Sequence, residues 1–361
     1  AGLRPAKAKL LAAKPAPQNT KGQTGRTPKT KKKTEPQPRY YCICFYLAGP
    51  VRCWGTSFDA ANVPVSLGYA RSVYTHRYYT CAIRASKAVE CWGSDLFGPT
   101  VTGLPLDLGP AVALALGPAY ACALLESGSV RCWGNLTDVE LPSDLGTVKA
   151  IAARSGHMCA LTASGPIPGA ARCWGANLYN QSSGVSTTVP VAAVAPGVRY
   201  TCILNASGAL QCQGITGSEP QPDLGPVAAV SAGDFHVCAL TLTGDARCWG
   251  PGISVHDSPP LDLGVAIRIF AGRNHTCVVT ALQAVKCWGS VDAVTQVPAD
   301  VGLVSSVSVG EKHVCAVLQG ETDVYIILMY VCVSMHACMH ACMMYAHTPN
   351  CWRTCFCSQF E

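Results

Sequence analysis

Short apolar runs recur along most of the chain and are separated by glycine, proline and polar residues. Val227–Ser231, Ile267–Ala271 and Val304–Val309 are examples in which apolar or β-branched residues mix with small polar ones. Runs of about four to eight such residues, bounded by turn residues, are typical of strands. No stretch keeps a helical period of useful length. The pattern therefore predicts an all-β protein with many short strands.

These runs belong to a repeated unit. Each unit has Asp-Leu-Gly, an apolar strand, small-Gly-x-x-(His/Tyr)-x-Cys-Ala-Leu, a turn with glycine, and Cys-Trp-Gly; Cys238–Gly250 shows its second half most clearly. Successive Cys-Trp-Gly motifs lie 36 to 41 residues apart, a period typical of stacked or circular repeat proteins. About four strands per unit, repeated seven times, predict a seven-bladed β-propeller. A stacked β-solenoid is the alternative, although its turns are usually shorter.

The tryptophan of Cys-Trp-Gly stands at the same phase in six units, and Gln213 replaces it in a seventh. Six tryptophans at one phase are more typical of packing anchors between blades than of a ligand cage. The predicted structural residues are Trp54, Trp92, Trp133, Trp174, Trp249 and Trp288.

Spacing is constant in one part of the unit and variable in another. The Asp slot precedes the first cysteine by 15 residues, whereas the gap from the Trp slot to the next Asp slot ranges from 10 to 15. Scaffold strands keep their length while loops vary, and in a repeat fold such loops gather on one face. The candidate binding loops are Ser94–Leu106, Asn135–Ser143, Ala176–Ser186 and Pro251–Leu261.

Paired cysteines flank each glycine turn, mostly 10 residues apart, so they stand opposite each other on a hairpin. Directly opposite positions suit a disulfide. Reduced core cysteines are the alternative, and a zinc site would need tighter pairs. The predicted bridges are Cys42–Cys53, Cys81–Cys91, Cys122–Cys132, Cys159–Cys173, Cys202–Cys212, Cys238–Cys248 and Cys277–Cys287. Seven bridges would imply an oxidising compartment, extracellular or lumenal.

Eight cysteines are left over, and seven of them lie near the C-terminus: Cys44, Cys315, Cys332, Cys338, Cys342, Cys351, Cys355 and Cys357. Cys315 opens an eighth unit, but Tyr325 stands where its partner would be. Residues 335–342 read Met-His-Ala-Cys twice, as a tandem ATGC repeat would translate. We therefore interpret residues 319–361 as a low-complexity Cys/Met/His tail and as a possible gene-model artefact. Disorder with free thiols and a metal site of His336, Cys338, His340 and Cys342 are alternatives.

Two residues before each first cysteine stands a ring with a polar tip: Tyr40, Tyr79, Tyr120, His157, Tyr200, His236, His275 or His313. A histidine beside a cysteine can form a catalytic thiol–imidazole pair. Tyrosine cannot replace histidine as a base near neutral pH, so a packing role with one hydrogen bond is expected. The Asp slot, for example Asp107, is expected to cap a turn.

Residues 1–39 contain 11 basic residues and one acidic residue, a net charge of +10, and no aromatic residue. They are predicted to be a disordered basic tail or linker. The 16 basic and 20 acidic residues of 40–361 give that part −4. Nucleic-acid binding is therefore not expected except through the tail. No apolar run approaches the roughly 18 residues that span a bilayer.

Residues 40–318 resemble the regulator-of-chromosome-condensation repeat family of seven-bladed propellers. The resemblance rests on Gly233–Leu240 with Cys248-Trp249-Gly250 and their counterparts. The paired cysteines are closer to a branch that includes crinkly-type receptor kinase ectodomains and bacterial extracellular members. The founding member of the family is a nuclear exchange factor for a small GTPase that also binds chromatin.

No Walker loop, Gly-x-Ser-x-Gly or His-Glu-x-x-His motif occurs, so we expect no enzyme activity, cofactor or metal. The expected function is protein binding through the variable loops of an extracytoplasmic propeller. The resemblance leaves two alternatives: a guanine-nucleotide exchange factor or chromatin-binding protein, with a small GTPase as partner, and the ectodomain of a receptor-like kinase. Two options for ring closure also remain open, because Leu303–Leu318 either completes the first blade or begins an eighth.

Overall fold

The computed structural model of the chain describes residues 40–46, 48–95, 103–137, 139–163, 169–183, 190–215, 224–250, 258–290, 292–319, 326–332 and 358–359. Every structural statement below concerns these residues. The predicted tail over 1–39 and the candidate metal ligands His336, Cys338, His340 and Cys342 lie outside them. The described elements belong to the unit Arg39–Glu361.

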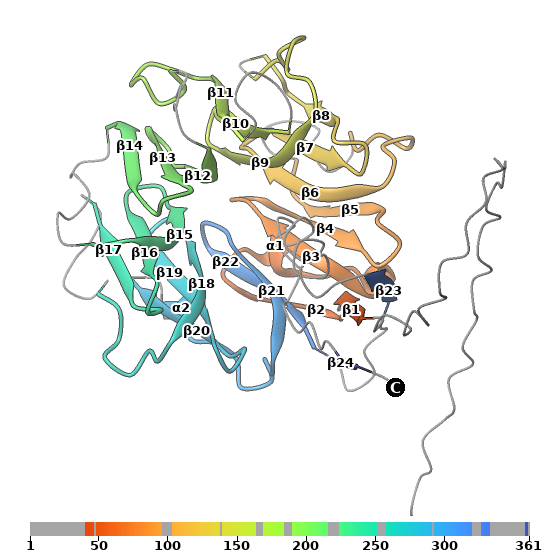
Figure 1. The fold of residues 1–361 in the computed structure, drawn as a ribbon, viewed down its shortest axis with the longest axis vertical. Coiled ribbons are helices and arrows are strands. Elements are labelled where there is room, and N and C mark those ends of the chain that lie inside the picture. The colour runs from red at the N-terminus through yellow and green to blue at the C-terminus, as the bar shows by residue number, and fades with distance from the viewer. Residues whose placement is uncertain are drawn as a thin grey trace, which may run out of the picture. The chain divides into compact units, whose positions relative to one another are not determined.

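Seven three-stranded antiparallel sheets surround a central channel, so the predicted seven-bladed propeller is confirmed (Figure 1). Six of these blades use consecutive strands: β3 (Ala70–Thr75), β4 (Tyr79–Arg84) and β5 (Val89–Gly93); β6 (Ala111–Leu116), β7 (Tyr120–Leu125) and β8 (Val130–Gly134); β9 (Val148–Arg154), β10 (His157–Thr162) and β11 (Ala171–Gly175); β12 (Val191–Pro196), β13 (Tyr200–Asn205) and β14 (Leu210–Gly214); β15 (Val227–Ala232), β16 (Val237–Thr241) and β17 (Ala246–Trp249); β18 (Ala266–Ala271), β19 (His275–Thr280) and β20 (Val285–Gly289).

The seventh blade joins the two ends of the ring. β2 (Val51–Gly55) pairs with β22 (His313–Leu318), which pairs in turn with β21 (Val304–Val309). Of the two options that the sequence leaves open, the structure therefore has the last strands completing the first blade. Pairing a strand from the beginning of the ring with two strands from its end fastens the two ends of the ring together.

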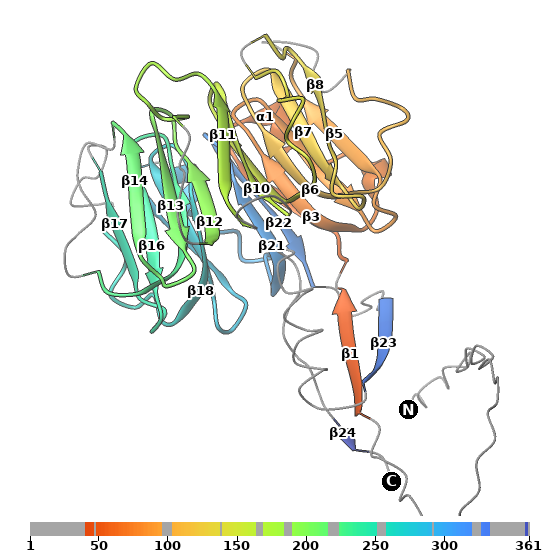
Figure 2. The same ribbon diagram turned by 45° about the horizontal axis from the view of Figure 1, so that its top comes forward.

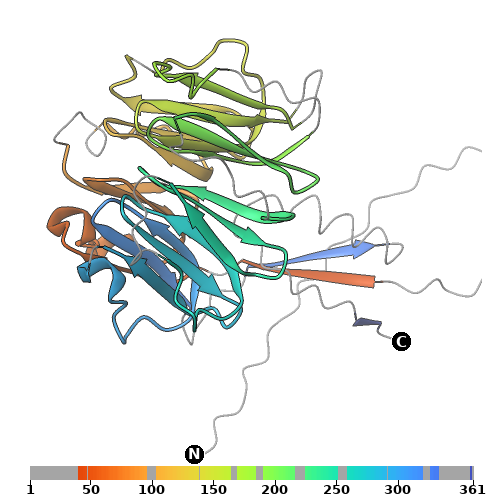
Figure 3. The same cartoon turned by 90° about the vertical axis from the view of Figure 1, so that its left-hand side faces the viewer.

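A separate small sheet contains β1 (Tyr40–Tyr46), β23 (Ile326–Cys332) and β24 (Ser358–Gln359). Figures 2 and 3 show β1 beside β23. The predicted hairpin of Cys42 with Cys53 is wrong, because Cys42 pairs in register with Tyr330 while Cys53 stands opposite Cys315. The spacing of the repeat does not reveal this difference, because Cys42 precedes Cys53 by almost the usual interval although its strand belongs to another sheet.

Each blade has three strands in the described residues rather than about four. The described parts of the segments after Cys-Trp-Gly include the short helices α1 (Phe58–Ala61), η1 (Val65–Leu67) and α2 (Asp292–Thr295). None of the helices in the described ranges is long and apolar enough to cross a bilayer. Parts of these connections, among them 96–102, 216–223 and 251–257, lie outside the described residues, so the predicted fourth strand stays a prediction there.

The hydrophobic core is divided among the seams between blades. The described residues form seven apolar clusters, and each combines side chains of two neighbouring blades. The second strand of each blade is buried almost throughout, as in β4 and β7, because sheets cover both of its faces. The seam between the blades of β10 and β13 has the smallest of these clusters, and it is the one that Gln213 faces in place of tryptophan.

The glycine of Cys-Trp-Gly is fixed by backbone contact. Gly250 has a φ of 140°, and a Cβ there would lie 2.5 Å from the carbonyl oxygen of Phe235. Gly93 has a φ of 115° and a similar clash with Tyr78. A positive φ and a close backbone approach both require glycine, which explains why this residue is constant where the tryptophan is not.

Candidate functional site

The structure contains six hairpin disulfides at predicted positions, each between directly opposed strand residues. They are Cys81–Cys91, Cys122–Cys132, Cys159–Cys173, Cys202–Cys212, Cys238–Cys248 and Cys277–Cys287. The seventh joins Cys53 to Cys315 across 262 residues. Cys315, which the repeat spacing leaves without a partner, is thus the ring-closing cysteine.

The tryptophans lie in the seams between blades. Trp92 donates its Nε1–H to the carbonyl oxygen of Ala60 at 3.0 Å, and Trp54 does the same to Val294 at 2.9 Å. Both acceptors belong to the connection that follows the preceding blade. Gln213 donates to the carbonyl oxygens of Gln181 and Ser183 instead. This slot therefore packs a seam and holds the beginning of a variable connection.

The aromatic slot before each first cysteine also joins neighbouring blades. Tyr79 contacts the carbonyl oxygens of Gly117 and Tyr120 with its hydroxyl, both at 2.7 Å. Tyr200 makes the same contact with the next blade. The neighbouring cysteines are in disulfides, so these rings have no thiol partner and form a belt of inter-blade hydrogen bonds.

Three of the four histidines in this slot use a threonine of the next blade. His157 lies 2.9 Å from the Thr201 hydroxyl, His236 lies 2.8 Å from Thr276, and His313 lies 2.9 Å from Thr80, in each case through Nε2. Where the slot holds tyrosine, the corresponding residue of the next blade is Ala121, Met158 or Val237. The shorter imidazole needs a side-chain hydroxyl, whereas the phenol reaches the backbone directly.

The Asp slot makes an ion pair that the sequence analysis missed. Asp107 pairs with Arg131 at 3.1 Å, and Asp144 pairs with Arg172 at 2.7 Å. The arginine hydrogen bond lowers the pKa of both carboxyls. Each arginine stands directly before the second cysteine of its unit. The sequence signal for the ion pair was therefore an acidic residue in the Asp slot together with a basic residue at this second position. The expected cap is present beside this ion pair, because each of the two carboxyls also accepts a hydrogen bond from its own backbone.

One end of the blades carries constant turns and the beginnings of the variable connections, and it is the candidate binding face. We call the turns between the first and second strands of the blades the mouth turns. The residue after Cys-Trp-Gly donates its N–H to a mouth turn, as Ser94 does to Tyr78 and Asn135 to Ala119. Three predicted loops therefore begin beside the mouth turns. Of the fourth, residues 251–257 lie outside the described residues, as do 96–102, 138 and 184–186 of the others.

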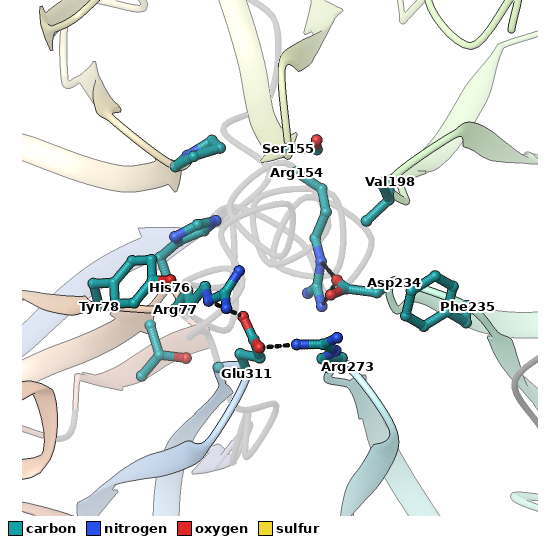
Figure 4. A pocket seen from close by; sticks show the side chains of 13 residues that line it. His76, Arg77, Tyr78, Arg154, Ser155, Val198, Asp234, Phe235, Arg273 and Glu311 are labelled. Carbon is teal, nitrogen blue, oxygen red and sulfur yellow. Dashed lines mark hydrogen bonds and ion pairs between the residues drawn. The ribbon is translucent and has the colours of Figure 1, made fainter. Parts of the chain in front are cut away.

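The mouth turns surround a cavity of about 380 Å³ (Figure 4). Below it, the first strands of all seven blades line a second cavity of about 260 Å³ in the channel. The upper cavity falls within the size range of ligand pockets, about 300–1,000 Å³. Because seven distant segments build it, no local motif could have revealed it.

Two units depart from the repeat and place side chains in this cavity. Most mouth turns begin with glycine, and a Cβ at Gly117 or Gly233 would meet the following ring at 2.1 to 2.8 Å. His76 and Arg154 occupy the glycine position in the other two units. These exceptions to the template were the available sequence signal for the cavity.

Ion pairs tie the blades together across the cavity. Arg154 contacts the Asp234 carboxylate at 2.6 and 2.9 Å and also reaches the carbonyl oxygen of Ala271. Glu311 is shared by Arg77, at 2.6 Å, and Arg273. Burial, with Arg154 nearby, lowers the pKa of His76 to about 3, so this ring is neutral. The cavity therefore combines charged side chains with apolar and aromatic ones such as Val198 and Phe235.

Comparison with known proteins finds one family model that matches a unit of this chain. Residues 227–250 match the family model of the regulator of chromosome condensation (RCC1) repeat. A comparison with curated proteins gives no significant match. The crinkly WD40 ectodomain of the Arabidopsis thaliana receptor kinase ACR4 is similar at 23% identity and a TM-score of 0.58, over 69% of this chain and 90% of that one.

Two further solved structures share the fold. The ectodomain of the Physcomitrella patens receptor kinase CR4 is 27% identical, with a TM-score of 0.57 over 69% of each chain. Prp20p from Saccharomyces cerevisiae, described with its binding to Gsp1p and histones, is 15% identical, with a TM-score of 0.62 over 84% of this chain and 96% of that one. The repeat match and the likeness to these solved structures show that the chain has an RCC1-like β-propeller fold.

Proposed function

We propose that the protein is a non-enzymatic binding module that holds a protein partner on the face carrying the mouth turns and the variable connections. The main support for this proposal is that the variable connections begin beside the mouth turns that surround the cavity. The hydrogen bond from the Asn135 N–H to the carbonyl oxygen of Ala119 is an example. Rigid scaffolds commonly present binding residues on such loops. The cysteines and histidines that resemble catalytic pairs are engaged in disulfides and in seams.

We place this function outside the cytoplasm, in an extracellular or lumenal compartment. Disulfides persist in oxidising compartments and are rare in the cytosol and nucleus. Seven bridges, including Cys53–Cys315, support this assignment. The likeness to two receptor kinase ectodomains favours a second candidate, the ligand-binding part of a cell-surface receptor.

The remaining alternative is a guanine-nucleotide exchange factor or chromatin-binding protein. Its support is the likeness to Prp20p, and at 15% identity that likeness shows the fold alone. Under this alternative the partner is a small GTPase or nucleosomal protein, and the cysteines stay reduced. The thiol state therefore separates the two assignments.

Site-specific photo-crosslinking tests the binding face. A photoreactive residue replaces Phe235 in a mouth turn, where the side chain is 40% exposed. The matched control replaces Leu242, which is 72% exposed at the turn between β16 and β17. We expect a discrete protein adduct on living cells from position 235 and none from 242. Adducts of equal yield at both positions, or adducts with nuclear proteins only, would overturn the proposal.

A further inference from the structure

Positive charge is concentrated around the cavity. The mouth turns, with Arg154 at the end of β9, carry five basic residues: Arg77, Arg154, Arg199, Arg273 and Lys312. They carry two acidic residues, Asp234 and Glu311. The charge of these turns is therefore +3, whereas residues 40–361 together have −4. The side chains that line the cavity itself contribute three of the bases and both acids, a net charge of +1. Such a local excess of one sign attracts ligands of the other.

The two acidic residues do not neutralise this charge. Asp234 balances Arg154, but Glu311 alone serves both Arg77 and Arg273. A guanidinium group has five N–H donors, and Glu311 accepts from Nε of Arg77 and from one terminal nitrogen of Arg273. This triad keeps one net positive charge.

The two guanidinium groups are accessible although Glu311 is not. Glu311 is 7% exposed, whereas the side chains of Arg77 and Arg273 are 45% and 39% exposed. Figure 4 shows all three converging on the centre of the ring. Glu311 thus fixes the arginines from below, and their other donors remain available at the cavity.

An apolar and aromatic rim accompanies these charges. Phe235, Val198 and Tyr78 line the cavity, and Phe235 is 40% exposed. Aromatic residues and arginines are the types most enriched at the centres of protein interfaces. A peptide with an acidic group and flanking apolar surface is complementary to this combination.

We propose that the cavity binds a carboxylate of an acidic segment of the protein partner, held between Arg77 and Arg273. The inference rests on the proposed function and specifies the chemistry of its partner. Guanidinium groups hold carboxylates through paired N–H donors, as Arg77 and Arg273 already hold Glu311 on the inner side. The incoming carboxylate takes the outer donors and brings the charge of the triad to zero.

The test measures fluorescence anisotropy of the full, oxidised chain with a labelled peptide of eight glutamates. A peptide of eight lysines is the charge control, and free glutarate is the competitor that represents a small acid. We expect binding of the glutamate peptide alone, weakened by salt. Equal binding of both peptides, no binding, or displacement by glutarate at the peptide's own concentration would overturn the inference.

Substitutions in the triad of Arg77, Glu311 and Arg273 test whether these residues bind the peptide. Removing the arginines alone would strand buried Glu311, so the test variant is the triple substitution Arg77→Gln, Glu311→Gln, Arg273→Gln. It should weaken binding about tenfold or more, as expected for charged hydrogen bonds. Glu311→Gln alone should strengthen binding, because it frees both guanidinium groups. Arg131→Gln, a base in an ion pair with Asp107, is the matched control and should change little.

A merely structural triad predicts the opposite of the Glu311→Gln result. Unchanged or weaker binding in that variant, with the same melting temperature as the parent chain, would contradict the inference. The crosslink at position 235 reports the binding face whatever the charge of the cavity. A partner that still crosslinks there while the triple variant binds it normally would refute the acidic segment and leave the proposed function intact.

Discussion

His313 of the ring-closing blade and Thr80 of the blade β3–β5 join neighbouring blades, although 233 residues separate them in the chain. Nε2 of His313 lies 2.9 Å from the Thr80 hydroxyl, and that hydroxyl donates its own proton to the carbonyl oxygen of Ala60 at 2.8 Å. The imidazole must therefore donate from Nε2, which fixes its neutral tautomer. The ring closes through the same kind of hydrogen bond that His157 makes with Thr201 and His236 makes with Thr276.

Thr201→Val tests the energetic weight of this bond in an ordinary seam. The substitution leaves Nε2 of His157 and the carbonyl oxygen of Gln181 without their hydroxyl partner. A buried polar group that loses its partner costs about 1–3 kcal/mol. We expect a loss of this size in the free energy of unfolding measured with urea. Thr201→Ser keeps the hydroxyl and should lose less free energy of unfolding. Equal losses in the two variants would contradict a dominant role of the hydrogen bond.

His275 is the exception among the histidines, since Val314 stands where the other seams have threonine. Both ring nitrogens of His275 are buried and lack a partner in the described residues. Val314→Thr should therefore raise the free energy of unfolding by about 1 kcal/mol. Val237→Thr is the matched control, because Tyr200 faces it and leaves the new hydroxyl unused; this variant should be destabilised. If both variants lose the same free energy of unfolding, the pairing of a histidine with a threonine of the next blade does not stabilise the fold.

The buried histidines make the fold acid-sensitive. Burial lowers the pKa of His157 and His313 to about 4, and that of His275 to about 3, from 6.5. The unfolded chain then binds more protons below pH 6.5, so stability is complete above that pH and falls towards pH 4. Each unit of pKa difference contributes about 1.4 kcal/mol. Urea unfolding at pH 7.5, 5.5 and 4.5 should show this decline, and a flat profile would contradict neutral, buried rings.

The ring-closing disulfide should stabilise the fold more than a hairpin disulfide does. Cys53–Cys315 spans 262 residues and Cys81–Cys91 spans 10. Loop-closure entropy of the unfolded chain then predicts about 5–6 kcal/mol for the first and about 3 kcal/mol for the second. Paired Cys→Ser variants of each bridge, compared by urea unfolding, test the difference. Equal losses would mean that the bridges act through native packing.

The repeat determined most of the fold because its slots correspond to positions in a blade. The spacing of Cys81 and Cys91 predicts their pairing, and the phase of Trp92 predicts a packing position. Cys53 could not be assigned in this way, because its partner belongs to the far end of the chain and a nearer cysteine, Cys42, had almost the same spacing.

The cavity was beyond the same reasoning. Arg77, Asp234 and Glu311 occupy variable positions of separate repeats, and only closure of the ring brings them around one cavity. The substitution of a template glycine by Arg154 was the available hint. The constant positions of the repeat are occupied by residues that pack the blades. The residues of the cavity stand at positions where a unit differs from the repeat.

The connection of Cys53 tests the central claim most directly, because ring closure and an oxidising compartment both depend on it. The native protein is alkylated without reductant and digested, and its disulfide-linked peptides are identified by mass spectrometry. We predict a peptide that joins Cys53 to Cys315, together with the six hairpin pairs. A peptide joining Cys42 to Cys53, or full alkylation of Cys53, would contradict the account.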